Sequence, residues 1–190
     1  MSRLFRDIAP RYMRLAMKDF GLTTFQAAGM FGNFGHETGG FLHWQEIKPV
    51  VKGSRGGFGW AQWTGQRRKE FEAYCARNWH DPKSHDTNYG FLYFELTGTE
   101  KRALSLLKRT TTLSGATLSF MRNFERPGAP HEESRLKWAG IALDALARDG
   151  VIEKPVQPSQ EPAAQPKGFP WWWAVAGAIA AAVAAFLGLR

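Results

Sequence analysis

The stretch that decides the fold is Gly32-Asn33-Phe34-Gly35-His36-Glu37-Thr38-Gly39-Gly40-Phe41. Thr23 is followed three residues later by Gln26, a capping-box pattern that predicts a helix from about Thr24 to Thr38. The paired glycines at 39 and 40 then end this helix. Glu37 therefore falls in the last turn, where the negative end of the helix dipole disfavours a second negative charge and favours a protonated carboxyl.

A second stretch rich in glycine and tryptophan follows at residues 53–65. From Phe41 to Gly65 the helical period is lost, and glycine-rich turns separate short aromatic pieces. This pattern predicts a small β-hairpin or a related glycine-rich element between helices.

Helical patterning surrounds these two stretches. Leu4, Ile8 and Met13 favour an N-terminal helix that ends near Gly21, with Pro10 in its first turn. A loop is expected at 78–85, around Pro82. Further helices are expected at 67–75, 89–96, 100–108, 113–124 and 132–147. We therefore predict a mainly α domain over residues 1–150 with a minor β element.

Composition changes after Gly150. Residues 151–170 hold prolines at near-regular intervals among Gln, Ala and Ser, which predicts a semi-extended linker. Trp171 to Leu189 carries no charge and would span roughly 29 Å as a helix, close to the roughly 30 Å hydrocarbon thickness of a bilayer. We therefore expect a transmembrane helix at 171–190, with the lipid bilayer as a partner and Trp171 to Trp173 as its interfacial anchor.

Small residues recur every four positions in that segment, at Gly177, Ala181 and Ala185. This spacing permits close pairing of two membrane helices and weak self-association, but the same residues also serve as low-volume filler. The N-terminus alternates charged and apolar residues and lacks the continuous apolar run of a secretory signal, so we expect no signal peptide.

The formal net charge of +8 favours polyanionic partners such as the bacterial envelope. The longest basic run is only Arg67 to Lys69, so nucleic acid is not expected as a partner. Cys75 is the single cysteine, which excludes an intramolecular disulfide and a cysteine-based zinc site. His36-Glu37 begins like a His-Glu-x-x-His zinc helix, but Gly40 stands at the second histidine position. No metal and no other cofactor is predicted.

Glu37 is the principal candidate for acid catalysis. Glycoside hydrolysis requires a proton donor for the leaving oxygen and usually a second carboxylate. Phe34, Phe41 and Trp44 are expected to surround Glu37, to reduce its solvation and so to raise its pKa.

Three motifs in order carry a family resemblance: Gly32 to Phe41, Gly56 to Gly65, and Phe124-Glu125-Arg126-Pro127-Gly128. Together they resemble the phage tail lysozyme family of the lysozyme-like superfamily over residues 10–147. The resemblance implies an α+β lysozyme-like fold and a peptidoglycan-cleaving enzyme with Glu37 as the general acid. It also implies that the segment ending in Gln62-Trp63 lines the sugar groove.

The second carboxylate is open. Glu46 follows Glu37 with eight residues between them, which resembles the Glu-x8-Asp spacing of inverting phage lysozymes. Two positions depart from that pattern: Glu46 stands in place of Asp, and Lys52 stands in place of Thr. Thr64 is a candidate for the missing hydroxyl. Glu46 is either the catalytic base or an ordinary ion-paired surface residue.

If no second acid acts, the enzyme would be a lytic transglycosylase, in which a hydroxyl of the sugar attacks and Glu37 serves first as acid and then as base. The two chemistries leave different sugar ends, reducing in the first case and 1,6-anhydro in the second.

Four further residues are candidates for substrate binding. Gln62 either binds an N-acetyl group or positions water, or it only pins the hairpin through a hydrogen bond. Trp44, Trp60 and Trp63 have rings suited to stacking on sugars, although at least one of them is expected in the core. Glu125-Arg126 is interpreted as a structural ion pair at a helix end, without a catalytic role.

These features together predict a phage or prophage lysozyme that acts on the host envelope and is held by a C-terminal helix. Two rivals stay open. One is a virion or envelope component that binds peptidoglycan without cutting it. The other is a membrane-active lysis protein whose essential part is residues 171–190.

Overall fold

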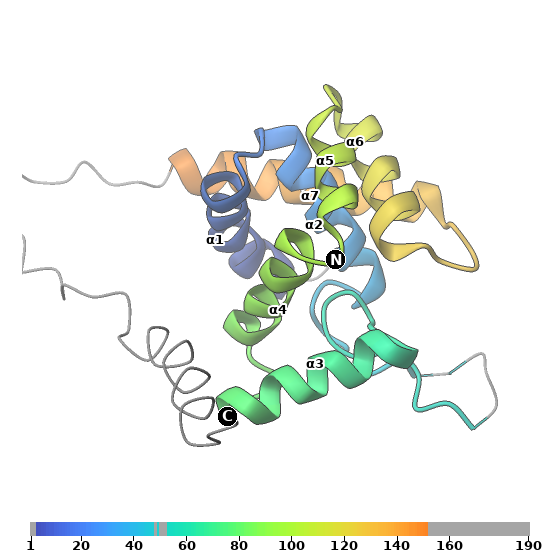
Figure 1. Cartoon of the computed structure of the whole chain (residues 1–190). Helices are drawn as coiled ribbons and strands as arrows, with labels where there is room; N and C mark the ends of the chain where they lie inside the picture. Colours follow the sequence, from blue (N-terminus) through green and yellow to red (C-terminus); the bar gives the residue numbers. More distant parts are fainter. Residues whose placement is uncertain (1–2, 48, 50–52, 152–190) are drawn as a thin grey trace, which may run out of the picture. The chain divides into compact units, whose positions relative to one another are not determined.

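Helix α2 (Thr24–Glu37) is the element on which three other helices pack. The computed structural model describes residues 3–47, 49 and 53–151, and these are mainly helical (Figure 1). Helix α2 packs against α1 (Arg3–Phe20), α6 (Leu113–Phe120) and α7 (Glu132–Val151). Residues 26–35 of α2 are all buried, so this helix passes through the core.

The predicted start of α2 is confirmed. Thr23 Oγ1 accepts a hydrogen bond from the backbone N–H of Gln26 (3.3 Å), and Gln26 Oε1 accepts one from the N–H of Thr23 (2.9 Å). The Gln26 amide also donates to the carbonyls of Lys108 and Thr110. The capping box therefore also ties α2 to the end of α5 (Lys101–Lys108).

Three glycines allow the neighbouring helices to approach α2 closely. A Cβ atom at Gly29 would lie 2.6 Å from the backbone nitrogen of Thr117 on α6, and one at Gly32 would lie 2.6 Å from the nitrogen of Ala139 on α7. At Gly35 it would meet the ring of Trp138 at 2.9 Å. The glycines in α2 therefore serve helix packing.

The other predicted helices are confirmed, with shifts at their ends. The remaining elements are α3 (Gly65–Asn78), α4 (His85–Thr97) and a π-helical turn η1 (Met121–Glu125) that continues α6. In Figure 1, α2, α6 and α7 gather in the upper half of the view, whereas α3 lies across the lower part.

Pro10 is placed differently from the prediction. It lies in the interior of α1, where it is buried, and not in the first turn. Proline has no N–H group, so α1 lacks one internal hydrogen bond at this point. Burial of Phe5, Ala9 and Met13 on the same helix outweighs that local cost.

The predicted β-hairpin is not formed. In the part of residues 41–64 that the structure describes, pairing is limited to two isolated antiparallel bridges, Gln45 with Phe58 and Phe58 with Trp63. Positive φ angles at Gly56, Gly59 and Gln62 turn the backbone away from an extended conformation. The segment is therefore a folded loop closed by single bridges.

No helix within residues 3–47 and 53–151 is long and apolar enough to cross a membrane. Helix α7 ends at Val151, and the predicted linker and transmembrane helix, residues 152–190, lie outside the described residues.

Candidate active site

A cleft of about 560 Å³ opens beside the C-terminal end of α2. Its wall includes Glu37 from α2, Glu46 from the following loop, Gln62 and Thr64 from the glycine-rich segment, and Glu125 from the end of η1. The cleft therefore gathers three carboxyl groups from separate parts of the chain.

Glu37 is the last residue of α2, and its partner is a buried arginine. The guanidinium of Arg135 on α7 donates a hydrogen bond of 2.6 Å to Glu37 Oε1, and Arg135 is only 1% exposed. This ion pair with Arg135 differs from the aromatic surroundings expected for Glu37. Phe34 packs in the core against Phe31, and Phe41 packs against Trp60. Glu37 is thus held in an ion pair with Arg135.

Arg135 is fixed by further hydrogen bonds. Its Nε donates to the carbonyl of Pro130 (2.8 Å), and a terminal nitrogen donates to Asn33 Oδ1 (3.0 Å). Asn33 is fully buried on α2 and donates to the carbonyl of Thr117 on α6. Since each of the three guanidinium nitrogens donates to a partner, the network holds the charge of Arg135 at one place beside Glu37.

Glu46 also lines the cleft, but it has a role in the loop. Its Oε2 accepts a hydrogen bond of 2.8 Å from the backbone N–H of Gly57, and its own backbone N–H donates to the carbonyl of Gly57. Glu46 therefore joins the two sides of the glycine-rich segment.

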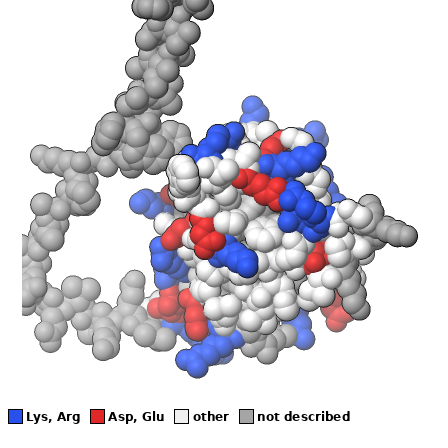
Figure 2. Space-filling model, turned by 90° about the horizontal axis from the view of Figure 1, so that it is seen from below, with Lys and Arg blue, Asp and Glu red and all other residues white. Residues whose placement is uncertain are grey.

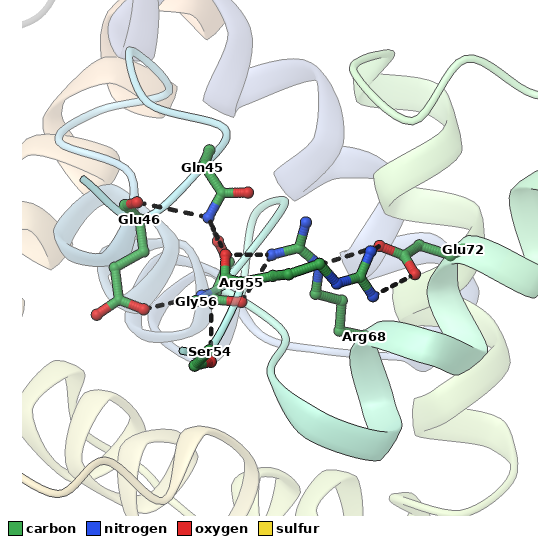
Figure 3. Close-up of polar contacts among 8 residues, drawn as sticks. Gln45, Glu46, Ser54, Arg55, Gly56, Arg68 and Glu72 are labelled. Carbon is green, nitrogen blue, oxygen red and sulfur yellow. Dashed lines mark hydrogen bonds and ion pairs between the residues drawn. The ribbon is translucent and has the colours of Figure 1, made fainter. Parts of the chain in front are cut away.

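An arginine from α3 holds the other side of this segment. The Arg68 guanidinium donates to the carbonyls of Arg55 and Gly56, and Glu72 accepts hydrogen bonds from both Arg55 and Arg68 (Figure 3). Gln45 donates to the Arg55 carbonyl from the opposite side. The loop is thus fixed at both edges.

Gln62 and Thr64 lie in the cleft wall. The Gln62 side-chain amide donates to the carbonyl of Gly59 (2.9 Å), which pins the turn. Its Oε1 atom is shielded from solvent and has no hydrogen-bond partner among the described residues. Thr64 is exposed and precedes α3.

Two of the tryptophans predicted for the groove are in the core. Trp60 is 0% exposed and stacks on Phe41, and Trp63 is 1% exposed and stacks on Phe71. Neither ring face is open to a sugar. Trp44 is half-buried against His85 and does not line the cleft. Their aromatic surface is used for packing, where it stabilises the fold by its burial.

Glu125 is the residue whose interpretation changes most. The ion pair expected at Glu125-Arg126 is replaced by one between Arg126 and Glu100, with two hydrogen bonds of 2.8 Å. Glu125 instead faces the cleft from the end of the π-helical turn, an element often found at functional sites. Burial raises the pKa of Glu125 well above its usual range, and the nearby charge of Glu37 raises it further.

A buried charge network holds the turn that carries Glu125. Arg67 on α3 pairs with Glu95 through hydrogen bonds of 2.7 and 2.9 Å, and Glu95 also accepts one from the indole of Trp63. Arg67 donates to the carbonyl of Phe124 (3.0 Å) and lies 4.4 Å from the centre of its ring. The residue before Glu125 is therefore fixed through both its backbone and its side chain.

His36 lies beside the catalytic candidate and is held neutral. Its Nδ1 is 2.9 Å from Ser134 Oγ, and its ring lies 5.3 Å from that of His131. Burial, reinforced by the positive charge of Arg135 and by His131, lowers the pKa of His36 to about 4.

Within the described residues, no group of three or more His, Cys, Asp or Glu side chains is placed to hold a metal ion. On the face shown in Figure 2, basic and acidic side chains are interspersed, so that face carries no single basic block.

The sequence was compared with models of protein families. The model described as phage tail lysozyme matches residues 8–146. The chain belongs to the phage tail lysozyme family. Membership indicates a lysozyme-like enzyme that degrades peptidoglycan. Comparison with curated proteins and with solved structures gives no match.

The phage tail lysozyme domain thus brings together four of the residues singled out in the sequence: Glu37, Glu46, Gln62 and Thr64. Two charged residues of the site were not predicted from the sequence as site residues. Glu125 belongs to a quoted motif but was interpreted as structural, and Arg135 lies within a helix whose pattern gives no sign of a buried cation.

Proposed function

We propose that the cleft binds a glycan strand of peptidoglycan and that Glu37 is the carboxyl group on which cleavage of the glycosidic bond depends. The observation that carries this proposal is that Glu37 lines a cleft with Glu46, Gln62 and Thr64. The family match supports a lysozyme-like substrate for that cleft.

The proposed chemistry starts with transfer of a proton from a carboxyl group of the cleft wall to the glycosidic oxygen. The C–O bond then breaks, and an oxocarbenium-like transition state develops at the sugar. The carboxylate of Glu37, fixed by Arg135, lies at the cleft wall where it can stabilise that positive charge. Gln62 Oε1 is a shielded acceptor suited to an N–H donor of the substrate, such as an N-acetyl group.

The direct test replaces the carboxyl group without changing its size. Glu37→Gln should reduce the release of soluble fragments from purified peptidoglycan by roughly 100-fold or more, as loss of an acid–base group does. Helical content by circular dichroism should stay unchanged. The matched control is Glu133→Gln, at an exposed residue, which should keep full activity. Full activity in Glu37→Gln would remove the proposal.

A second candidate function is lytic transglycosylation. The observation that favours it is the hydrogen bond from Gly57 to Glu46, which gives Glu46 a role in holding the loop. In that reaction the sugar's own hydroxyl attacks, and no second carboxylate is required to activate water. Glu46→Gln would then keep more activity than Glu37→Gln, and 1,6-anhydro sugars would appear among the products.

We also propose that residues 171–190 anchor the enzyme at the membrane and that residues 151–170 link the two parts. Removal of residues 152–190 separates this arrangement from a membrane-active lysis protein. The shortened chain should keep its activity on purified peptidoglycan and lose its association with lipid vesicles. A protein that acts by disrupting membranes would instead lose its whole effect.

A further inference from the structure

Glu125 has the environment of a functional carboxyl group. It lines the same cleft as Glu37, and its Oε1 atom is shielded from solvent without a hydrogen-bond partner among the described residues. A buried polar atom left without a partner is costly, so its presence at a cleft wall indicates a use.

The charged groups that act on Glu125 come from several elements. The groups are Glu37 on α2, Arg67 on α3, Glu95 on α4, Arg126 after η1 and Arg135 on α7. Arg67 is already paired with Glu95, Arg126 with Glu100, and Arg135 with Glu37. Each of the three arginines therefore has a carboxylate partner other than Glu125.

Two nearby carboxyl groups in a poorly solvated site do not both ionise readily. Arg135 donates its hydrogen bond to Glu37 and not to Glu125, so the guanidinium charge lies against the Glu37 carboxyl group. The raised pKa of Glu125 agrees with this distribution, since burial and the charge of Glu37 are its two largest causes.

We propose that Glu37 and Glu125 form a catalytic carboxyl pair that shares a single proton, held by Glu125 in the resting enzyme. The proposal deepens the function proposed above and rests on it. It also assigns a role in the chemistry to the Phe124 to Gly128 motif, which otherwise forms only a turn.

The proton balance of the step follows from this pair. The shared proton goes to the glycosidic oxygen, the bond between that oxygen and the anomeric carbon breaks, and both carboxyl groups are then ionised. A water molecule or the sugar's own hydroxyl attacks the anomeric carbon, and the proton it loses returns to the pair. Arg67 and Arg135 favour the ionised form of Glu125 and so stabilise the doubly charged state between the two steps.

The test without substrate is a carbon-13 NMR titration of the intact protein labelled at the side-chain carboxyl carbons of glutamate. In the wild type, one carboxyl group should stay protonated at pH values where exposed glutamates have ionised. In Glu37→Gln the pKa of that group should fall, because the neighbouring charge is gone. If all the carboxyl groups titrate in the usual range, or if the raised pKa is unchanged in Glu37→Gln, the proposal is overturned.

The test with substrate uses Glu125→Gln. A neutral glutamine replaces a protonated carboxyl of the same shape, so a purely structural role would be preserved. We expect retained helical content and a loss of fragment release of roughly 100-fold or more, against full activity in Glu133→Gln. Full activity in Glu125→Gln would overturn the proposal. If the wild type cuts no glycan bond, the proposed function fails, while the titration still decides whether the pair shares a proton.

Discussion

Arg135 donates a hydrogen bond of 2.6 Å to Glu37 from 98 residues away in the sequence, and it does so from a fully buried position. The same guanidinium holds Asn33, four residues before Glu37 on α2. One side chain of α7 therefore fixes both the packing of α2 and the carboxylate at its end. This link makes the stability of the fold and the geometry of the site depend on each other.

Replacement of Arg135 should therefore affect both stability and activity. Arg135→Gln leaves Glu37 without its charged partner, and breaking a buried pair from one side costs about 3–5 kcal/mol. Urea unfolding should report a loss of that size, together with reduced fragment release. Arg122→Gln, which breaks an exposed pair with Glu132, should cost less than about 1 kcal/mol. Equal losses in the two variants would contradict this account.

The glycine at position 32 should tolerate no side chain. A Cβ atom there meets backbone atoms of Ala139 at 2.6 Å, so α2 and α7 must separate. We expect Gly32→Ala to lower the free energy of unfolding by about 1–3 kcal/mol, as overpacking does.

Gly140 provides the matched control for this prediction, because it also lies in a helix but a Cβ atom there meets nothing within 4 Å. Gly140→Ala should raise stability by about 0.5–1 kcal/mol through better helix propensity. Thermal or urea unfolding of the two variants tests the contrast. A stable Gly32→Ala protein would show that the contact between α2 and α7 is looser than described.

His36 should make the fold sensitive to acid. Its pKa in the fold is about 4, below the ordinary value of 6.5, so the unfolded chain binds a proton first as the pH falls. The contribution of neutral His36 to stability is therefore fully present above about pH 6.5 and is lost as the pH falls toward 4. The loss amounts to about 3–4 kcal/mol at most, since one pKa unit corresponds to about 1.4 kcal/mol.

The variant His36→Gln removes this titration and leaves the other groups in place. The difference in unfolding free energy between wild type and variant, measured by urea at several pH values, should therefore change between pH 6.5 and 4. A difference that is constant over this range would mean that His36 is not held neutral in the fold.

Local signals in the sequence predicted the helices well. The capping box at Thr23 and Gln26 places the start of α2 because the contacts involved lie within one turn. Pro10 was misplaced because packing of α1 overrides its local preference. The prediction of a hairpin was wrong because alternation of glycine and aromatic residues also fits a folded loop.

The sequence singled out four residues that line the cleft, Glu37, Glu46, Gln62 and Thr64, but not Glu125 or Arg135. Trp60 and Trp63 have the composition of a sugar-binding surface, and only the tertiary structure shows that their rings are in the core. Arg135 bonds to Glu37, and the charge of Glu37 acts on Glu125, across long separations in the chain that no periodicity in the sequence reports. The carboxyl partner of Glu37 therefore became visible only in three dimensions.

The most direct measurement of the central claim is mass spectrometry of the fragments that the wild-type protein releases from purified peptidoglycan. We expect fragments with new ends within the glycan strand, either reducing or 1,6-anhydro, and with the peptide stems intact. Fragments cut only in the peptide stems, or no release of fragments at all, would contradict it.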